Sequence, residues 1–230
     1  MDRKILNRRP LISLVTSRVR LPVARADYIG ALCSQVRAAV AAGVDLIQIR
    51  EIDLSDHVLF DLVSRSVDIA RGTQSVILVN DRFDVALAAG AGGTHLRASS
   101  MAAGLLRPHL PSGFVLGRSV HDLGEALKVS REGALDYVTM GTVFPSKSHP
   151  GERVCGVDAL SIASRAVTIP MLAIGGVTSD NIEMLFGAGV VGVAAVGLFA
   201  DPGSFGEFEA MGSIVAKIRG SYMEKHVQRD

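Results

Sequence analysis

The chain has 230 residues, a formal net charge of +1 at pH 7 and 48% hydrophobic residues. This composition is ordinary for a globular protein and argues against general disorder. Because positive and negative charges nearly balance, there is no electrostatic reason to expect nucleic acid or an anionic membrane as a partner. Any site for an anion therefore has to be local.

The ends of the chain and its cysteines bear on compartment and redox chemistry. Residues 1–9 are basic and polar, and no uncharged apolar segment long enough for a signal peptide or a membrane span follows them. We therefore expect a cytoplasmic protein. Cys33 and Cys155 lie far apart and lack metal-ligand spacing, so we expect two free thiols.

Short apolar runs alternate with longer amphipathic stretches along the chain. The runs are rich in Val, Ile and Leu without polar alternation, which is typical of strands buried on both faces of a parallel sheet. The pattern predicts strands at 11–16, 46–50, 75–79, 93–96, 115–119, 137–141, 170–174 and 192–196. It predicts helices at 28–42, 56–71, 83–89, 101–109, 122–132, 157–166, 181–187 and 205–217.

Eight strand–helix units in a chain of this length favour a single closed (β/α)₈ TIM barrel. We place the barrel at about residues 11–220 of one domain covering 1–230, with polar tails at both ends and a C-terminal tail that frays. The alternative is an open doubly wound sheet. No Gly-x-Gly-x-x-Gly turn follows the first strand, which disfavours the dinucleotide-binding version of that fold.

Polar residues follow the second and third strands, where a parallel barrel places its active site. Gln48 and Arg50 share one face and are expected at the barrel mouth, although Arg50 could also pair with Glu51 or Asp81. Asn80 is suited to hydrogen-bond a ring heteroatom. Asp81 could hold a metal or fix a cation, or it could cap the helix that begins near residue 83.

The fourth and fifth strands end in basic residues. Arg97 lies where an anion could be met, whereas His95 fits a packed, hydrogen-bonded core histidine better than a catalyst. Ser119 and His121 share a face by alternation, and a histidine can transfer protons near neutral pH. The alternative for His121 is a capping or packing role at the start of the next helix.

The loops after the last three strands contain candidate phosphate ligands. The loop after strand six contains Lys147 and His149, which could meet a phosphate or simply be solvated. Strand seven ends in Gly175 and Gly176, and strand eight ends in Val196 and Gly197. Glycines let backbone N–H groups approach a phosphate, and barrels often bind phosphate with these two loops. This agreement of position and chemistry is the strongest signal that the residues give by themselves.

Taken in order, these segments resemble the family of thiamin phosphate synthase and its relative TenI, the thiazole tautomerase. The segments are 48–51 (Gln-Ile-Arg-Glu), 79–84 (Val-Asn-Asp-Arg-Phe-Asp), 93–96 (Gly-Thr-His-Leu), 117–121 (Gly-Arg-Ser-Val-His), 141–145 (Gly-Thr-Val-Phe-Pro), 173–177 (Ala-Ile-Gly-Gly-Val) and 192–196 (Gly-Val-Ala-Ala-Val). The resemblance covers nearly the whole domain and implies a (β/α)₈ barrel that acts on the thiazole half of thiamin.

The resemblance implies two different activities. The synthase joins a pyrimidine diphosphate to a thiazole phosphate, releases pyrophosphate and needs Mg²⁺, for which Asp81 would be one ligand. Three positions depart from its pattern: Ile52 and His149 stand where it has lysines, and Ser100 stands where it has a metal-binding Asp. Lys147, Arg97 or Arg118 could supply charge instead, but a serine is a poor replacement for a carboxylate on a hard cation.

The tautomerase pattern fits the residues better. The tautomerase shifts a proton within a thiazole carboxylate phosphate without a cofactor. The histidine that is proposed to transfer this proton in the tautomerase matches His121. Gln48, Arg50, Asn80, Ser119 and Lys147 would then contact the substrate, while Gly175, Gly176, Val196 and Gly197 would bind its phosphate. A divergent synthase and a catalytically silent binder of a thiamin intermediate are the alternatives. Barrels of this type commonly pair, so a homodimer is an open expectation.

Overall fold

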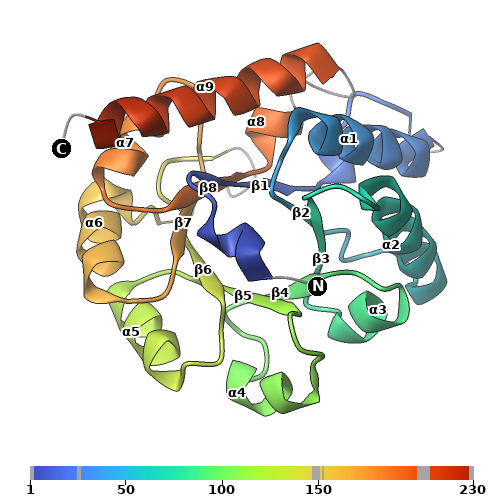
Figure 1. The fold of residues 1–230 in the computed structure, drawn as a ribbon, viewed down its shortest axis with the longest axis horizontal. Helices are drawn as coiled ribbons and strands as arrows, with labels where there is room; N and C mark the ends of the chain where they lie inside the picture. The colour runs from blue at the N-terminus through green and yellow to red at the C-terminus, as the bar shows by residue number, and fades with distance from the viewer. Residues whose placement is uncertain (1–2, 25–26, 147–150, 152, 201–207, 228–230) are drawn as a thin grey trace.

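The computed structural model describes residues 3–24, 27–146, 151, 153–200 and 208–227. Eight parallel strands pair in chain order, and β1 also pairs with β8, which closes the sheet into a barrel (Figure 1). The predicted (β/α)₈ barrel is confirmed. The alternative of an open doubly wound sheet is wrong, because the ring of strand pairs leaves no sheet edge.

The strands lie close to their predicted positions. They are β1 (Leu11–Val15), β2 (Leu46–Ile49), β3 (Val76–Asn80), β4 (Gly93–Leu96), β5 (Val115–Val120), β6 (Tyr137–Met140), β7 (Met171–Ile174) and β8 (Gly192–Ala195). The α-helices are α1 (Tyr28–Ala42), α2 (Asp56–Ala70), α3 (Phe83–Ala88), α4 (Ala103–Leu106), α5 (Leu123–Glu132), α6 (Gly156–Ala166), α7 (Ile182–Gly187), α8 (Gly197–Ala200) and α9 (Phe208–Val227). Short 3₁₀ helices are η1 (Arg3–Asn7), η2 (Arg18–Arg20) and η4 (Arg107–His109).

Both tails are more ordered than the sequence suggests. Figure 1 shows η1 across the centre of the ring of strands, where Ile5 and Leu6 are buried against the barrel interior. At the other end of the chain, α9 continues past the predicted end at residue 217 to Val227. Tyr222 makes an edge-on ring contact with Phe186 of α7 at 5.1 Å between centroids, so the expected fraying does not begin there.

The barrel interior is filled by alternate residues of each strand, as the period of two requires. Large and small side chains face each other in this interior. A Cβ atom at Gly117 would lie 2.2 Å from the Tyr137 ring, so the glycine leaves space for that ring. Tyr137 is 1% exposed and thereby fills the barrel centre below the mouth.

The N-terminal end of the barrel contains a buried ion cluster. The Asp45 carboxylate is fully buried and accepts a 2.8 Å hydrogen bond from the Ile12 backbone N–H. Its other oxygen lies 2.8 Å from Arg8 Nη1 and 3.6 Å from Arg219 Nη2. These contacts join β1, the residue before β2, the segment after η1 and α9, so the loss of one partner would leave a buried charge unpaired at the end of the barrel opposite the mouth.

The two cysteines and the apolar character of the helices bear on redox chemistry and on membrane insertion. Cys33 and Cys155 are free thiols, as predicted, and burial raises the pKa of each. Within the described residues, no helix combines the length and the apolar character that crossing a membrane would require.

Candidate active site

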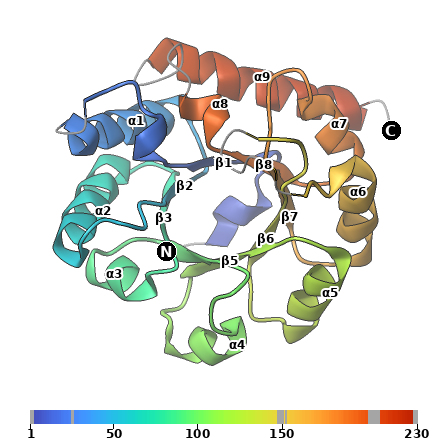
Figure 2. The same cartoon turned by 180° about the vertical axis from the view of Figure 1, so that it is seen from behind.

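A cavity of about 810 Å³ opens at the C-terminal ends of the strands. Figure 2 views the barrel from the side opposite to Figure 1. The last residues of the strands and the first residues of the following loops line the cavity. A parallel barrel brings these positions together because all eight strands end on the same side.

The structure brings most of the predicted site residues to this one cavity. Those that line it are Gln48, Arg50, Asn80, Ser119, His121, Gly175, Gly176, Val196 and Gly197. Asp81 lies beside the cavity and does not contribute to its lining. Lys147 and His149 lie outside the described residues, so their predicted contacts stay predictions.

Gln48 and Asn80 form a polar pair on the cavity wall. Gln48 Nε2 donates to Asn80 Oδ1 at 3.1 Å, which orients both amides. The half-buried Arg50 also lines the cavity, and among the described residues its side chain has no carboxylate partner. The alternative pairs with Glu51 and Asp81 are therefore wrong: those two carboxylates bind Arg18 and Arg97 instead.

His95 is buried at the base of the cavity, as expected for a packed histidine. Its Nδ1 lies 2.8 Å from the Tyr137 hydroxyl, and its Nε2 lies 2.9 Å from Ser119 Oγ. Burial, together with the nearby Arg118 and Arg50 charges, lowers the pKa of His95 to about 3. The imidazole is therefore neutral at physiological pH, and its hydrogen bond fixes the direction of the Ser119 hydroxyl at the cavity wall.

His121 lies at the rim of the cavity, with its side chain 59% exposed. Its Nδ1 lies 3.2 Å from Glu125 Oε2, and the same carboxylate oxygen accepts a 2.8 Å bond from the His121 backbone N–H. Asp122, not His121, caps α5, because its side chain accepts from the Glu125 N–H. The capping alternative for His121 is therefore wrong, whereas its ring contacts Glu125 in the first turn of α5, which agrees with the alternative of packing at the start of that helix.

The loop after β7 requires its two glycines. Gly175 and Gly176 have φ values of 97° and 64°, in the left-handed region that favours glycine. A Cβ at Gly175 would lie 2.5 Å from Thr142 Cγ2, because the loops after β6 and β7 touch here. The Asn181 side chain donates to the Gly176 carbonyl at 2.8 Å and accepts from the Thr178 N–H, which fixes the loop beside the cavity.

Arg20 is a cavity residue that the sequence analysis missed. It ends η2 in the loop after β1, and its guanidinium lies 3.2 Å from where a Cβ of Gly197 would stand. Its position just after the first strand is the signal that could have found it, since the ends of all eight strands meet at the mouth. With Arg50, Arg97 and His121, it makes the lining basic, and the described lining contains no carboxylate. Basic side chains are therefore gathered at one place on a nearly neutral chain, and the local anion site stays a prediction.

Asp81 binds protein groups instead of presenting an open carboxylate. Its Oδ2 accepts from Arg97 Nε at 2.9 Å and from Nη2 at 2.6 Å, and its Oδ1 accepts from the Ser100 hydroxyl. The predicted cap on α3 is not formed, since no side chain caps that helix. Partial burial would raise the pKa of Asp81, but the bonds from Ser100 and Arg97 outweigh it and lower the pKa.

These residues do not fit a magnesium site. Mg²⁺ prefers carboxylate and water oxygens in a near-octahedral shell. Here one carboxylate is already bound to a guanidinium, and its neighbour is a serine. Across the described ranges, no three His, Cys, Asp or Glu side chains come together as metal ligands.

A comparison with known proteins identifies the family. The family model for thiamine monophosphate synthase matches residues 21–199, which is more than half of the chain. This chain belongs to the thiamine monophosphate synthase family. The resemblance noted from the sequence segments is thereby confirmed.

Individual members of the family are similar over most of their length. The thiamine-phosphate synthase of Methanoculleus marisnigri is 40% identical over 167 residues, which are 70% of this chain and 76% of that protein. That of Caldanaerobacter subterraneus subsp. tengcongensis is 32% identical over 84% of this chain and 89% of that protein. The structure of thiamine phosphate pyrophosphorylase from Pyrococcus furiosus superposes with a TM-score of 0.77 at 28% identity, covering 96% and 98% of the two chains.

Two of the three departures from the family's synthase pattern can be located in the structure. Ile52 is 70% exposed and lies outside the cavity lining. This apolar side chain therefore does not supply the positive charge of the lysine in the synthase pattern. Ser100 bonds to Asp81, as described above. Arg118 lies outside the cavity lining, and its guanidinium donates to the carbonyls of Met101, Ala98 and Ser100.

Proposed function

We propose that this protein is an enzyme of thiamin biosynthesis that binds a phosphorylated thiazole at the barrel mouth and shifts a proton within it. The observation that carries the proposal is the cavity itself. It combines a basic lining without carboxylates among its described residues, two glycine-containing loops, and a histidine at the rim. Family membership supports the assignment to thiamin chemistry.

The phosphate would bind at the loops after β7 and β8. Gly175 and Gly176 keep the backbone of the first loop free of side chains, and Gly197 does the same where the second loop faces Arg20. The Arg20 guanidinium stands beside Gly197 and would add a charge-assisted bond to the phosphate. Gln48, Asn80, Ser119 and Arg50 would then contact the rest of the ligand.

His121 would transfer the proton. With Nδ1 donating to the Glu125 carboxylate, Nε2 is the acceptor nitrogen and can take a proton from one atom of the thiazole carboxylate phosphate. The imidazolium would then return a proton to a second atom, so that no group leaves and the ligand keeps its composition. Glu125 would hold the tautomer and stabilise the imidazolium, and no metal enters the reaction.

Synthase activity is the second candidate. Two of the relatives described above are named thiamine-phosphate synthases and the third is named a thiamine phosphate pyrophosphorylase, and these names support this activity more directly than they support the tautomerase. A synthase would bind a pyrimidine diphosphate as well as the thiazole phosphate. Against it stand the residues at the metal position, where Asp81 is bound to Arg97 and Ser100.

Two assays on one preparation separate these candidates. The first follows the isomerisation of thiazole carboxylate phosphate in EDTA. The second follows thiamin phosphate formation from pyrimidine diphosphate, thiazole phosphate and Mg²⁺, with an authentic synthase as control. Isomerisation alone supports our proposal, and thiamin phosphate formation alone would replace it with the synthase. Binding without either reaction would identify a silent binder.

The homodimer stays a prediction that a sedimentation measurement can check.

A further inference from the structure

Three side chains at the ends of β3 and β4 form a closed cluster beside the cavity. Asp81 uses one carboxylate oxygen for two bonds from Arg97 and the other for the Ser100 hydroxyl. Ser100 in turn accepts the Arg97 backbone N–H at 3.0 Å. The guanidinium therefore stands beside Asp81 with its charge neutralised in part by that carboxylate, in a fixed geometry.

The buried side chain of Arg118 holds the loop that contains Ser100. Arg118 is 6% exposed, and its guanidinium donates to the carbonyls of Met101 at 2.9 Å, Ala98 at 3.1 Å and Ser100 at 2.5 Å. Three bonds from one buried guanidinium hold the loop in place. Ser100 is therefore held against Asp81, and Arg97 is held where it both binds Asp81 and lines the cavity.

The cluster faces the phosphate loops across the barrel. In a ring of eight strands paired in chain order, β3 and β4 lie opposite β7 and β8. A ligand whose phosphate binds at Gly175 and Gly176 therefore presents its far end to Arg97. The side chain of Arg97 is 59% exposed, so the guanidinium is accessible from the cavity while Asp81 holds it.

We propose that Arg97 stands in the place of a divalent cation and binds a second anionic group of the ligand, a carboxylate at the end opposite the phosphate. The choice of ligand rests on the proposed function, because thiazole carboxylate phosphate has these two anionic ends. Guanidinium and carboxylate match in a bidentate geometry. The cavity thus selects a ligand with a phosphate at one end and a carboxylate at the other, and it does so without metal.

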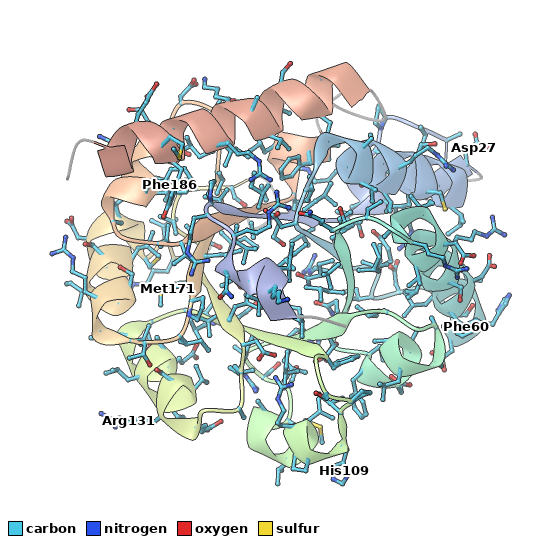
Figure 3. The ribbon with its side chains drawn as sticks, in the orientation of Figure 1. Asp27, Phe60, His109, Arg131, Met171 and Phe186 are labelled. Atoms are coloured by element: carbon cyan, nitrogen blue, oxygen red, sulfur yellow. The ribbon has the colours of Figure 1, made fainter. Side chains whose placement is uncertain are left out.

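Calorimetric titrations on the intact protein test this proposal. Thiazole carboxylate phosphate should bind wild type equally well in EDTA and in Mg²⁺, and a titration with Mn²⁺ should show no saturable site. Arg97→Ala should weaken binding of this compound by about tenfold or more, since charge-assisted bonds are lost. Binding of thiazole phosphate, which lacks the carboxylate, should stay nearly unchanged. Arg131→Ala, on the outer helix α5 (Figure 3), is the matched control.

Different results would overturn the proposal for Arg97 and the proposed function. Saturable Mn²⁺ binding to wild type, weaker ligand binding in EDTA, or equal effects of Arg97→Ala on the two thiazoles would each overturn the proposal. If neither thiazole compound binds wild type, the proposed function fails. The Mn²⁺ titration then decides separately whether Arg97 excludes the cation, because it needs no thiazole and is unaffected by any misfolding of the variant.

Discussion

The two ends of the barrel use charged residues in different ways. At the N-terminal end, Asp45 is fully buried and is matched by Arg8 and Arg219. At the mouth, Arg50 and His121 line a cavity whose described residues include no carboxylate. The first arrangement joins elements of the fold, whereas the second creates a positive potential where a ligand can enter. Substitutions at the mouth should therefore change activity, and substitutions at the opposite end should change stability.

The largest effect is expected at the rim of the mouth. His121→Ala removes the proposed proton-transfer group, so kcat for thiazole carboxylate phosphate should fall by roughly 10²–10⁴-fold. The melting temperature should stay the same, because the side chain is mostly exposed. Steady-state kinetics and a thermal melt check both parts. His109→Ala, on the outside of the barrel (Figure 3), is the control, and unchanged turnover in His121→Ala would refute the assignment.

The opposite result is expected at the closed end. Asp45→Ala leaves the Ile12 N–H without its partner and places two arginines together, which should lower the free energy of unfolding by about 3 kcal/mol. This is the low end of the range for buried pairs, because both arginines are partly exposed. Urea unfolding measures the loss, and Asp68→Ala, in an exposed pair with Arg71, is the control. A loss of activity in Asp45→Ala without a loss of stability would contradict the expectation that substitutions at this end change stability and not activity.

The base of the cavity should show a pH effect of its own. His95 has a pKa of about 3 in the folded protein and about 6.5 when unfolded. Between these values the unfolded chain binds a proton that the folded protein does not, so stability falls as the pH falls, by about 1.4 kcal/mol per pH unit. Urea unfolding at several pH values should show a shallower acid slope in His95→Gln than in wild type. The exposed His57→Gln variant should keep the wild-type slope, and equal slopes in all three proteins would contradict the burial of a neutral His95.

The smallest effect is expected behind His121. Glu125→Gln weakens a charge-assisted bond by about 1 kcal/mol, so kcat should fall about fivefold while KM stays the same. Glu132→Gln, at the far end of α5, serves as the control. A change in KM alone would show that Glu125 contacts the ligand instead of positioning His121.

The sequence predicts the barrel well because each strand is a short apolar run between amphipathic helices. The limits of β4 and α1 are predicted to the residue. The tails are predicted poorly, since tertiary contacts order them: Ile5 and Leu6 pack under the barrel, and Tyr222 packs on Phe186. Composition alone does not reveal such contacts.

The sequence predicts where the site residues lie better than it predicts which of their charged side chains form ion pairs. The rule that strand ends meet at one face brings Gln48, Asn80 and His121 to one cavity, as expected. It does not say which ions pair, because pairing depends on side-chain geometry between neighbouring loops. The alternative pairs of Arg50 with Glu51 or Asp81 are therefore not formed, and the sequence does not predict the bond between Asp81 and Arg97.

Proton transfer by His121 can be followed through the incorporation of solvent deuterium into thiazole carboxylate phosphate, detected by NMR in D₂O with EDTA present. Wild type should incorporate deuterium without metal, since the His121 proton exchanges with solvent, and His121→Ala should not. Absence of incorporation in wild type, with Mg²⁺-dependent thiamin phosphate formation by the same preparation, would show that the protein is a synthase and not a tautomerase.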